Sequence, residues 1–232
     1  MYIDWTYIVL VLPAVLFAMW VSAHVNSVFS KYKNSRNSRG ITGAEAARYV
    51  LNNSGLNHVR IEHISGSLTD HYDPRDNVVR LSDEVYGSCS AVAVGIACHE
   101  CGHAMQHAQN YAPVKIRAAI IPITNIGSKL AVPLIIIGLL FSSFGQAFIT
   151  VAYIGVAAFA LSTVFQLVTL PTEFDASKRA LRCIDDLGLL QGSDYDEAKK
   201  VLSAAAMTYV AALAVSLMQL LRLILIVRSN DR

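Results

Sequence analysis

The sequence predicts a mainly α-helical integral membrane protein, with about four transmembrane helices and a small α+β domain inserted after the first. Two observations lead to this class. Hydrophobic residues make up 54% of the 232 residues and charged residues only 16%, which is too apolar for an ordinary soluble domain. Long uncharged segments alternate with charge-bearing ones. The net charge of +2 is too small to favour nucleic acid as a partner.

The first apolar segment, from Trp5 to Ser30, contains no Asp, Glu, Lys or Arg. About 20 such residues span the hydrocarbon core of a bilayer, so residues 1–30 are predicted to hold the first transmembrane helix. A cleaved signal peptide is disfavoured, because Asp4 is the only early charge and no basic region precedes the apolar run. The cations that follow at once predict a cytoplasmic side after this helix: Lys31, Lys33, Arg36 and Arg39.

Residues 31–117 are predicted to form a small domain. A capping-box pattern from Thr42 to Glu45 indicates a helix start, and an alternation of apolar and polar residues indicates a half-buried strand. The predicted elements are a helix over 43–53, strands at Val59–Ile64 and Asn77–Ser82 with a turn at Asp73–Asp76, and a helix over about 90–109. The second strand could offer an edge to an extended peptide, or the two strands could form an ordinary hairpin packed on the last helix.

That last helix carries a His-Glu-x-x-His motif, from His99 to His103. Residues four apart share one helical face, so both imidazoles can approach one metal ion. Glu100 lies about 100° around from His99, where it can hold a metal-bound water. Two histidines, a third protein ligand and an open water position make a catalytic zinc site. The alternative is a helix with two incidental histidines and a buried glutamate.

The C-terminal half predicts three further spans. Leu130–Thr172 is uncharged and too long for one helix, which indicates a transmembrane hairpin over 118–171, turning at Ser142–Gln146 and ending at Pro171. A charged segment over 172–203 follows, and residues 204–232 hold the last span and a tail, with Arg222 as its one ion before Val227. Four spans place both termini outside and the charged segments in the cytoplasm.

The third ligand must come from the same side of the membrane as the motif. Glu173 meets this condition, because two predicted spans separate it from His103 and it emerges at the end of a span. A His₂Glu set is a known catalytic zinc arrangement. Asp175 is the competing ligand, on a different helical face. We favour Glu173, with Asp175 as a carboxylate that orients a histidine.

The order of these segments resembles the YugP-type membrane zinc metallopeptidases over nearly the whole chain, and that family is similar to the larger HtpX and CAAX-prenyl proteases. The matching segments are Tyr72–Pro74, Val79–Ser82, His99–Gln106, Leu170–Ser177 and Thr208–Ala212. The resemblance implies a zincin-like domain, a multi-pass protein of a bacterial plasma membrane, and Glu173 as the third ligand. Ser177 stands where the larger relatives have an Asp.

The expected activity is hydrolysis of peptide bonds in proteins or peptides, with one Zn²⁺ as cofactor, the lipid bilayer as surroundings and no nucleic acid as partner. Glu100 is expected to act as general base and then as general acid. Tyr209 is one candidate for stabilising the oxyanion; Tyr72, Arg179 and His107 are others.

Two other functions are weighed. The first is a non-catalytic membrane scaffold with structural zinc, although such a site needs no general base. The second is a site-2-type protease that cleaves within the bilayer, although the charged domain places His99 outside the bilayer centre. The Cys98–Cys101 pair has a redox spacing, but it lies in mid-helix, and Cys101 is predicted to point away from the metal.

Overall fold

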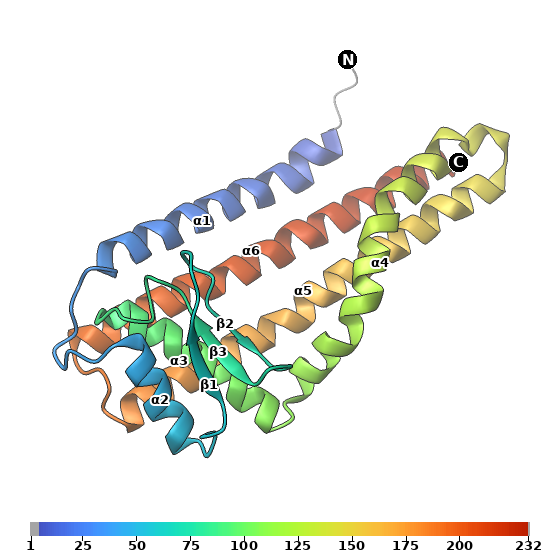
Figure 1. Cartoon of the computed structure of the whole chain (residues 1–232). Helices are drawn as coiled ribbons and strands as arrows, with labels where there is room; N and C mark the ends of the chain where they lie inside the picture. The colour runs from blue at the N-terminus through green and yellow to red at the C-terminus, as the bar shows by residue number, and fades with distance from the viewer. Residues whose placement is uncertain (1–4, 232) are drawn as a thin grey trace. The chain divides into compact units, whose positions relative to one another are not determined.

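The structure, a computed structural model, describes residues 5–231 and divides into two compact units. The first unit comprises residues 5–21, 115–170 and 208–231, and the second comprises residues 22–114 and 171–207. The elements are a helical turn at Tyr7–Val11 that continues into α1 (Leu12–Tyr32), α2 (Gly43–Asn53), β1 (Arg60–His63), β2 (His71–Asp73), β3 (Val78–Leu81), α3 (Ala91–Ala108), α4 (Ala112–Leu140), a 3₁₀ turn at Ser142–Phe144, α5 (Gln146–Asp186) and α6 (Ser193–Asn230) (Figure 1).

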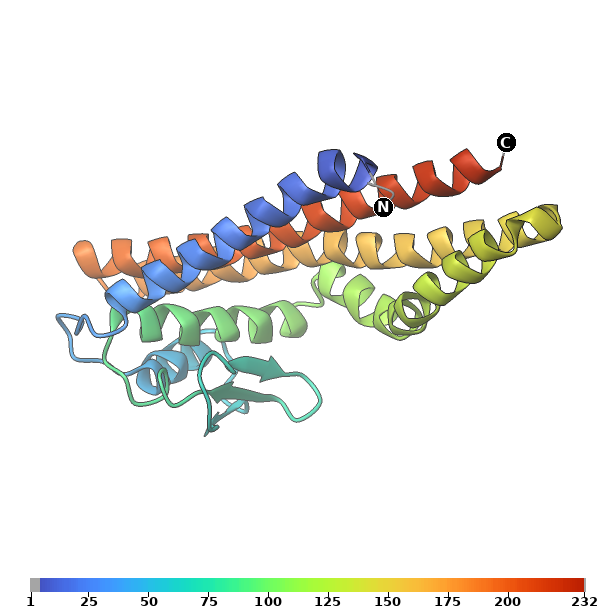
Figure 2. The ribbon, with the colours of Figure 1, turned by 90° about the horizontal axis from the view of Figure 1, so that it is seen from above.

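Four helices among the described residues are long and apolar enough to cross a membrane: Tyr7–Tyr32, Ala112–Leu140, Gln146–Asp186 and Ser193–Asn230. The expected mostly helical chain with four candidate spans is therefore confirmed. The helix α4 contains Pro122 and Pro133, and Figure 2 shows it changing direction along its length, as prolines inside a helix cause.

The expected helix end at Pro171 is wrong, because α5 continues through this residue to Asp186. Membrane helices tolerate an internal proline when neighbouring groups satisfy the freed carbonyl. Likewise α6 begins at Ser193, before the apolar part of its sequence. The charged segment between the last two spans thus consists mainly of helical extensions of α5 and α6, joined by a short link.

The sheet also differs from the expected hairpin. Its order is β1-β3-β2, with β1 parallel to β3 and β2 antiparallel to β3. The sequence did not reveal β2, because three residues are too few for a recognisable alternation. The strand before α3, β3, is therefore the central strand and is paired on both sides. The expectation that this strand could offer a free edge to a peptide is wrong. Within the described sheet the free edges belong to β1 and β2.

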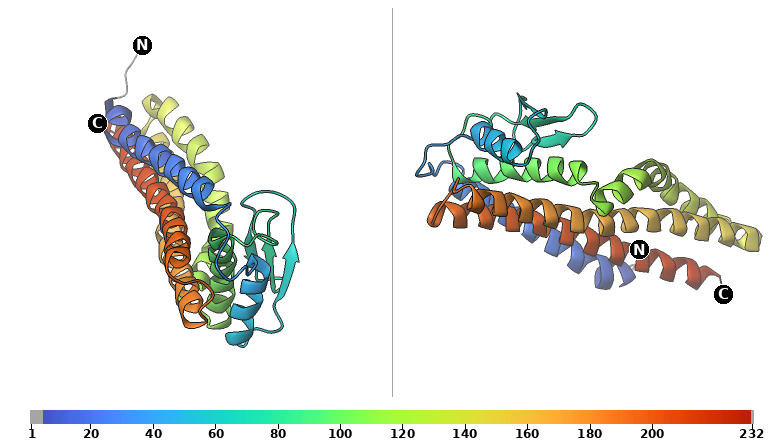
Figure 3. Two further views of the ribbon diagram at one scale, coloured as in Figure 1. Left: turned by 90° about the vertical axis from the view of Figure 1, so that its left-hand side faces the viewer. Right: turned by 90° about the horizontal axis from the view of Figure 1, so that it is seen from below.

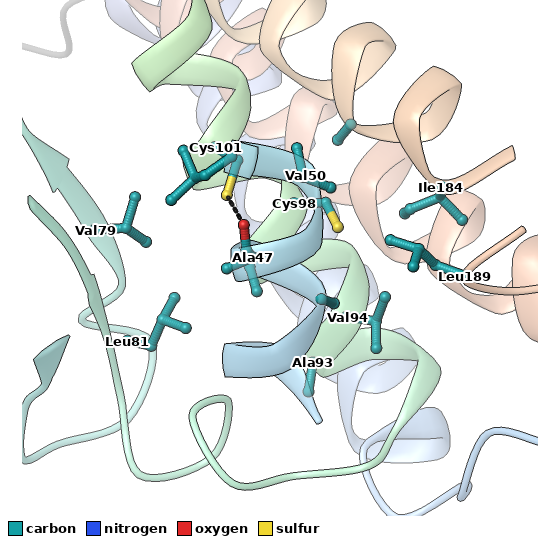
Figure 4. Close-up of a cluster of buried hydrophobic side chains, with 14 of the residues drawn as sticks. Ala47, Val50, Val79, Leu81, Ala93, Val94, Cys98, Cys101, Ile184 and Leu189 are labelled. Carbon is teal, nitrogen blue, oxygen red and sulfur yellow. Dashed lines mark hydrogen bonds between the residues drawn. The ribbon is translucent and has the colours of Figure 1, made fainter. Parts of the chain in front are cut away.

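The second unit is layered around α3. The views in Figures 2 and 3 show α3 between α2 and the sheet on one side and the charged ends of α5 and α6 on the other. Its core joins side chains from all of these elements (Figure 4), among them Val50, Leu81, Val94, Ile184 and Leu189. A Thr42–Glu45 capping box begins α2, as the sequence predicts.

Candidate metal centre

The helix α3 places His99 and His103 one turn apart on one face. Ser90 caps its first turn, since the Ser90 side chain accepts a hydrogen bond from the backbone N–H of Ala93. The two imidazole rings lie edge to face, with 4.8 Å between their centroids. Both side chains are largely buried, with 16% and 17% exposed. The spacing in sequence thus becomes a pair of nitrogens that face one point.

Glu173 reaches this pair because α5 packs closely on α3 within the second unit. The contact lies at Gly102, where a Cβ atom would come within 2.6 Å of the carbonyl oxygen of Ala176. With a larger residue at position 102, α3 and α5 could not approach each other so closely. Glu173, nearly one turn before Ala176 on α5, then points at the histidines and is only 3% exposed.

The donor atoms of these three residues suit a zinc ion. The Oε2 atom of Glu173 lies 3.4 Å from Nε2 of His99 and 3.5 Å from Nε2 of His103. A tetrahedral ion with ligand bonds of about 2.0–2.1 Å separates its ligands by roughly 3.4 Å. All three donors lie within 4.8 Å of one another, and two imidazoles with one carboxylate form a zinc ligand set. The residues present fit the ion.

The outer nitrogens of the two histidines, meaning the Nδ1 atoms that are not proposed to bind the metal, have different hydrogen-bond partners. The Nδ1 atom of His99 lies 3.1 Å from the hydroxyl of Ser177, and Nδ1 of His103 lies 3.1 Å from Oε1 of Gln106. An amide oxygen only accepts, so Nδ1 of His103 donates its proton and leaves the Nε2 lone pair for a metal. Sequence analysis did not single out Gln106 or assign Ser177 this contact.

Asp175 is joined to this arrangement through Gln106. The fully buried Gln106 amide donates to the carbonyl oxygen of Thr172 at 2.8 Å and to Oδ2 of Asp175 at 2.9 Å. Arg179 also donates to that carboxylate oxygen. Asp175 is therefore linked to His103 through Gln106 and does not contact the histidine directly. It is not one of the three residues that could hold a metal ion.

Glu100 is held by the sheet. One of its carboxylate oxygens accepts a hydrogen bond of 3.0 Å from the backbone N–H of Tyr72 in β2, and the side chain is buried. The Tyr72 ring packs against His107, with 5.4 Å between centroids, which places His107 beside the sheet.

Burial lowers the pKa of His103, but the neighbouring carboxylates of Glu173 and Glu100 outweigh it and raise the pKa overall.

The remaining candidates are distributed over both units. Tyr209 belongs to the first unit, in α6. The Tyr72 hydroxyl donates to Asn77, and Arg179 contacts Asp175 and Gln109.

Cys98 and Cys101 lie in the core of the second unit (Figure 4). Burial raises the pKa of both thiols, so they remain protonated and unreactive near neutral pH.

Two comparisons with known proteins found matches over most of the chain. The sequence profile of a family described as "Putative neutral zinc metallopeptidase" matches residues 7–228. The chain is also 42% identical over 220 residues to the "Putative membrane protease YugP" of Bacillus subtilis (strain 168), covering 95% of this chain and 96% of that protein. No solved structure matches the chain.

Proposed function

Because the chain belongs to the neutral zinc metallopeptidase family matched above, we propose that it is a membrane-embedded, zinc-dependent endopeptidase that hydrolyses peptide bonds in protein substrates. The observation that carries this proposal is the convergence of His99, His103 and Glu173, with Glu100 beside them. A buried carboxylate next to the ligand set, fixed by a backbone N–H, suits a general base.

The residues of the site would have the following roles. His99, His103 and Glu173 hold the zinc, which when bound lowers the pKa of a water towards neutrality and polarises the scissile carbonyl. Glu100 takes the proton of the attacking water and then delivers it to the leaving amine. The Tyr72 N–H keeps one oxygen of Glu100 occupied and so leaves the other for the water. Ser177 and Gln106 keep the imidazoles oriented.

A hydrogen-bond donor is also needed to stabilise the oxyanion of the tetrahedral intermediate. We keep Tyr209 as one candidate for this donor, with Tyr72, Arg179 and His107 as the others. For the substrate backbone we propose the free edge of β2, because Tyr72 in this strand bonds the general base. An extended peptide paired there would lie beside Glu100.

We also propose the zincin-like domain of residues 31–117 as the catalytic domain, facing the cytoplasm of a bacterium from its plasma membrane. The cations after α1 and in the charged parts of α5 and α6 support this orientation. A cysteine introduced at the exposed Asn34, with Cys89 and Cys183 replaced by serine, should react with a membrane-impermeant thiol reagent only after cells are opened. Labelling of intact cells would invert the topology.

Neither alternative function gains support. A structural zinc site gives no reason for the buried Glu100 beside the ligands. A site-2-type protease would need its motif helix within a span, whereas α3 is not among the four candidate spans of residues 5–231.

Replacement of Glu100 by Gln tests the mechanism. The amide oxygen can still accept from Tyr72, so zinc should remain bound at one ion per chain, while cleavage of an unfolded test protein should fall by about 10²–10⁴-fold. Zinc content is measured by atomic emission and cleavage by gel. Glu62→Gln in β1, which removes the same charge away from the ligands, should cleave normally. Normal proteolysis by the Glu100→Gln protein would sink the mechanism.

A further inference from the structure

The second unit contains a groove of about 480 Å³ between the charged parts of α5 and α6, a volume within the usual range for small-ligand sites. Leu181, Leu202 and Ala206 are among the apolar residues that line it. Lys178 and Arg182 line it from α5. None of the proposed zinc ligands lines it, so the proposed chemistry leaves the groove unexplained.

The groove faces away from α3. The residues of α5 that pack towards α3 are Ala176, Ala180 and Ile184, all fully buried. At about 100° per residue, Lys178 and Arg182 lie on the other side of the helix. An occupant of the groove would therefore not displace the ligands of the metal centre, although Ser177 lines the groove and also contacts His99.

One end of the groove continues the apolar parts of both helices. Phe174 lies two residues after the uncharged segment that ends at Thr172, and Met207 lies inside the last apolar segment. Both line the groove and are 45% and 37% exposed. Lys178 comes one turn after Phe174, about 6 Å along the helix. The polar headgroup region adds roughly 5–8 Å to each side of the hydrocarbon core, so Lys178 lies at its depth.

The charges of the groove favour an anion. Within residues 5–231 neither Lys178 nor Arg182 forms an ion pair or a side-chain hydrogen bond. Asp185 is the one acidic residue among those that line the groove, which leaves one positive charge in excess. A phosphate between two such cations and an acyl chain along the apolar residues Phe174, Ala206 and Met207 would match the lining of the groove.

We propose that this groove binds an anionic phospholipid, with its headgroup phosphate at Lys178 and Arg182 and an acyl chain along Phe174, Ala206 and Met207. The proposal depends on the chain being in a membrane and not on its peptidase activity. Basic pockets between membrane helices are a recurring form of headgroup site. A bound lipid would fill the space between α5 and α6 just beyond the helix turn that carries Glu173.

The test uses the full chain purified in an uncharged detergent and supplied with equal amounts of phosphatidylglycerol and phosphatidylcholine of identical acyl chains. Native mass spectrometry then counts the lipids retained. The wild-type protein should prefer phosphatidylglycerol by roughly 10-fold, as expected of two exposed cations. The double variant Lys178→Gln, Arg182→Gln should lose this preference. Equal retention of both lipids by the wild type would overturn the proposal.

Matched variants separate a built groove from diffuse charge. Lys199→Gln with Lys200→Gln removes the same charge from exposed positions of α6 outside the groove and should leave the preference intact. Ser203→Trp should fill the groove without a change of charge and lower retention of phosphatidylglycerol at least 5-fold. An equal loss in the Lys199, Lys200 variant would refute a specific site, as would full retention by Ser203→Trp.

Two competitors identify the occupant. A hundredfold excess of glycerol 3-phosphate should leave the bound phosphatidylglycerol in place, because it lacks acyl chains. An acidic soluble peptide of six glutamates should also fail to displace it. Displacement by either one would assign the groove to a soluble anion or to an acidic peptide, and the lipid proposal would fail.

Discussion

The two histidines of the metal centre lie one turn apart on the same helix but have unequal support. His99 has a single partner at its outer nitrogen, the hydroxyl of Ser177. His103 has a chain of partners, in which Gln106 is itself fixed by the Thr172 carbonyl and by Asp175. A hydroxyl can rotate, whereas a buried amide with two acceptors has one orientation. We infer that His103 is the rigid ligand and His99 the adaptable one.

The largest effect on this comparison is expected from Gln106→Ala. The change removes the acceptor at His103 and leaves the Thr172 carbonyl and the Asp175 carboxylate without their amide donor. Loss of an outer partner of a metal-binding histidine typically weakens metal affinity by about 10–100-fold. Competition with a calibrated zinc chelator measures this affinity in the purified chain. An affinity within twofold of wild type would show that the Gln106 network does not support His103.

A smaller effect is expected from Ser177→Ala. The change removes one neutral hydrogen bond, worth about 0.5–1.5 kcal/mol, which corresponds to a loss of roughly 2- to 10-fold in zinc affinity. The same chelator titration applies, and Ser177→Thr should recover most of the loss because it restores the hydroxyl. A loss larger than that of Gln106→Ala would reverse the assignment of rigid and adaptable ligands.

The double variant Gln106→Ala, Ser177→Ala sharpens the same comparison. If the two supports act independently, their effects on the free energy of zinc binding should add within about 0.5 kcal/mol. A much smaller combined loss would mean that both residues act through one shared rearrangement of α5. The melting temperature in excess chelator serves as the control for stability without metal.

The parts of the fold that the sequence predicted have local causes. The helix α2 is set by its capping box, and α3 lies within a residue of the expected limits because Ser90 caps it. The four candidate spans follow from composition alone. The pairing of β1 with β3 was not predictable in the same way, because strand direction depends on the connection between strands and on contacts distant in sequence.

The candidate site was likewise only partly predictable from the sequence. His99, Glu100 and His103 follow from helical periodicity, and Glu173 could be selected by counting spans. The contact of Ser177 with His99 and those of Gln106 with Thr172 and Asp175 were not accessible, because they depend on the rotation of α5 against α3. The contact of Gln106 with His103 is local to α3, where the two residues are three apart. A proline at 171 also suggested a helix end, whereas the helix runs on and carries Glu173, Asp175 and Ser177 on one continuous backbone.

The close contact of Gly102 with Ala176 has a consequence for biosynthesis. Since the chain is made from its N-terminus, α3 emerges with two imidazoles long before Glu173 is translated. The carboxylate can meet them only after α4 and α5 have been made and α5 has docked against the bare backbone at Gly102. A nascent or wrongly inserted chain therefore lacks a complete ligand set. Under the proposed function, the protein would gain its hydrolytic capacity only after α5 has docked on α3.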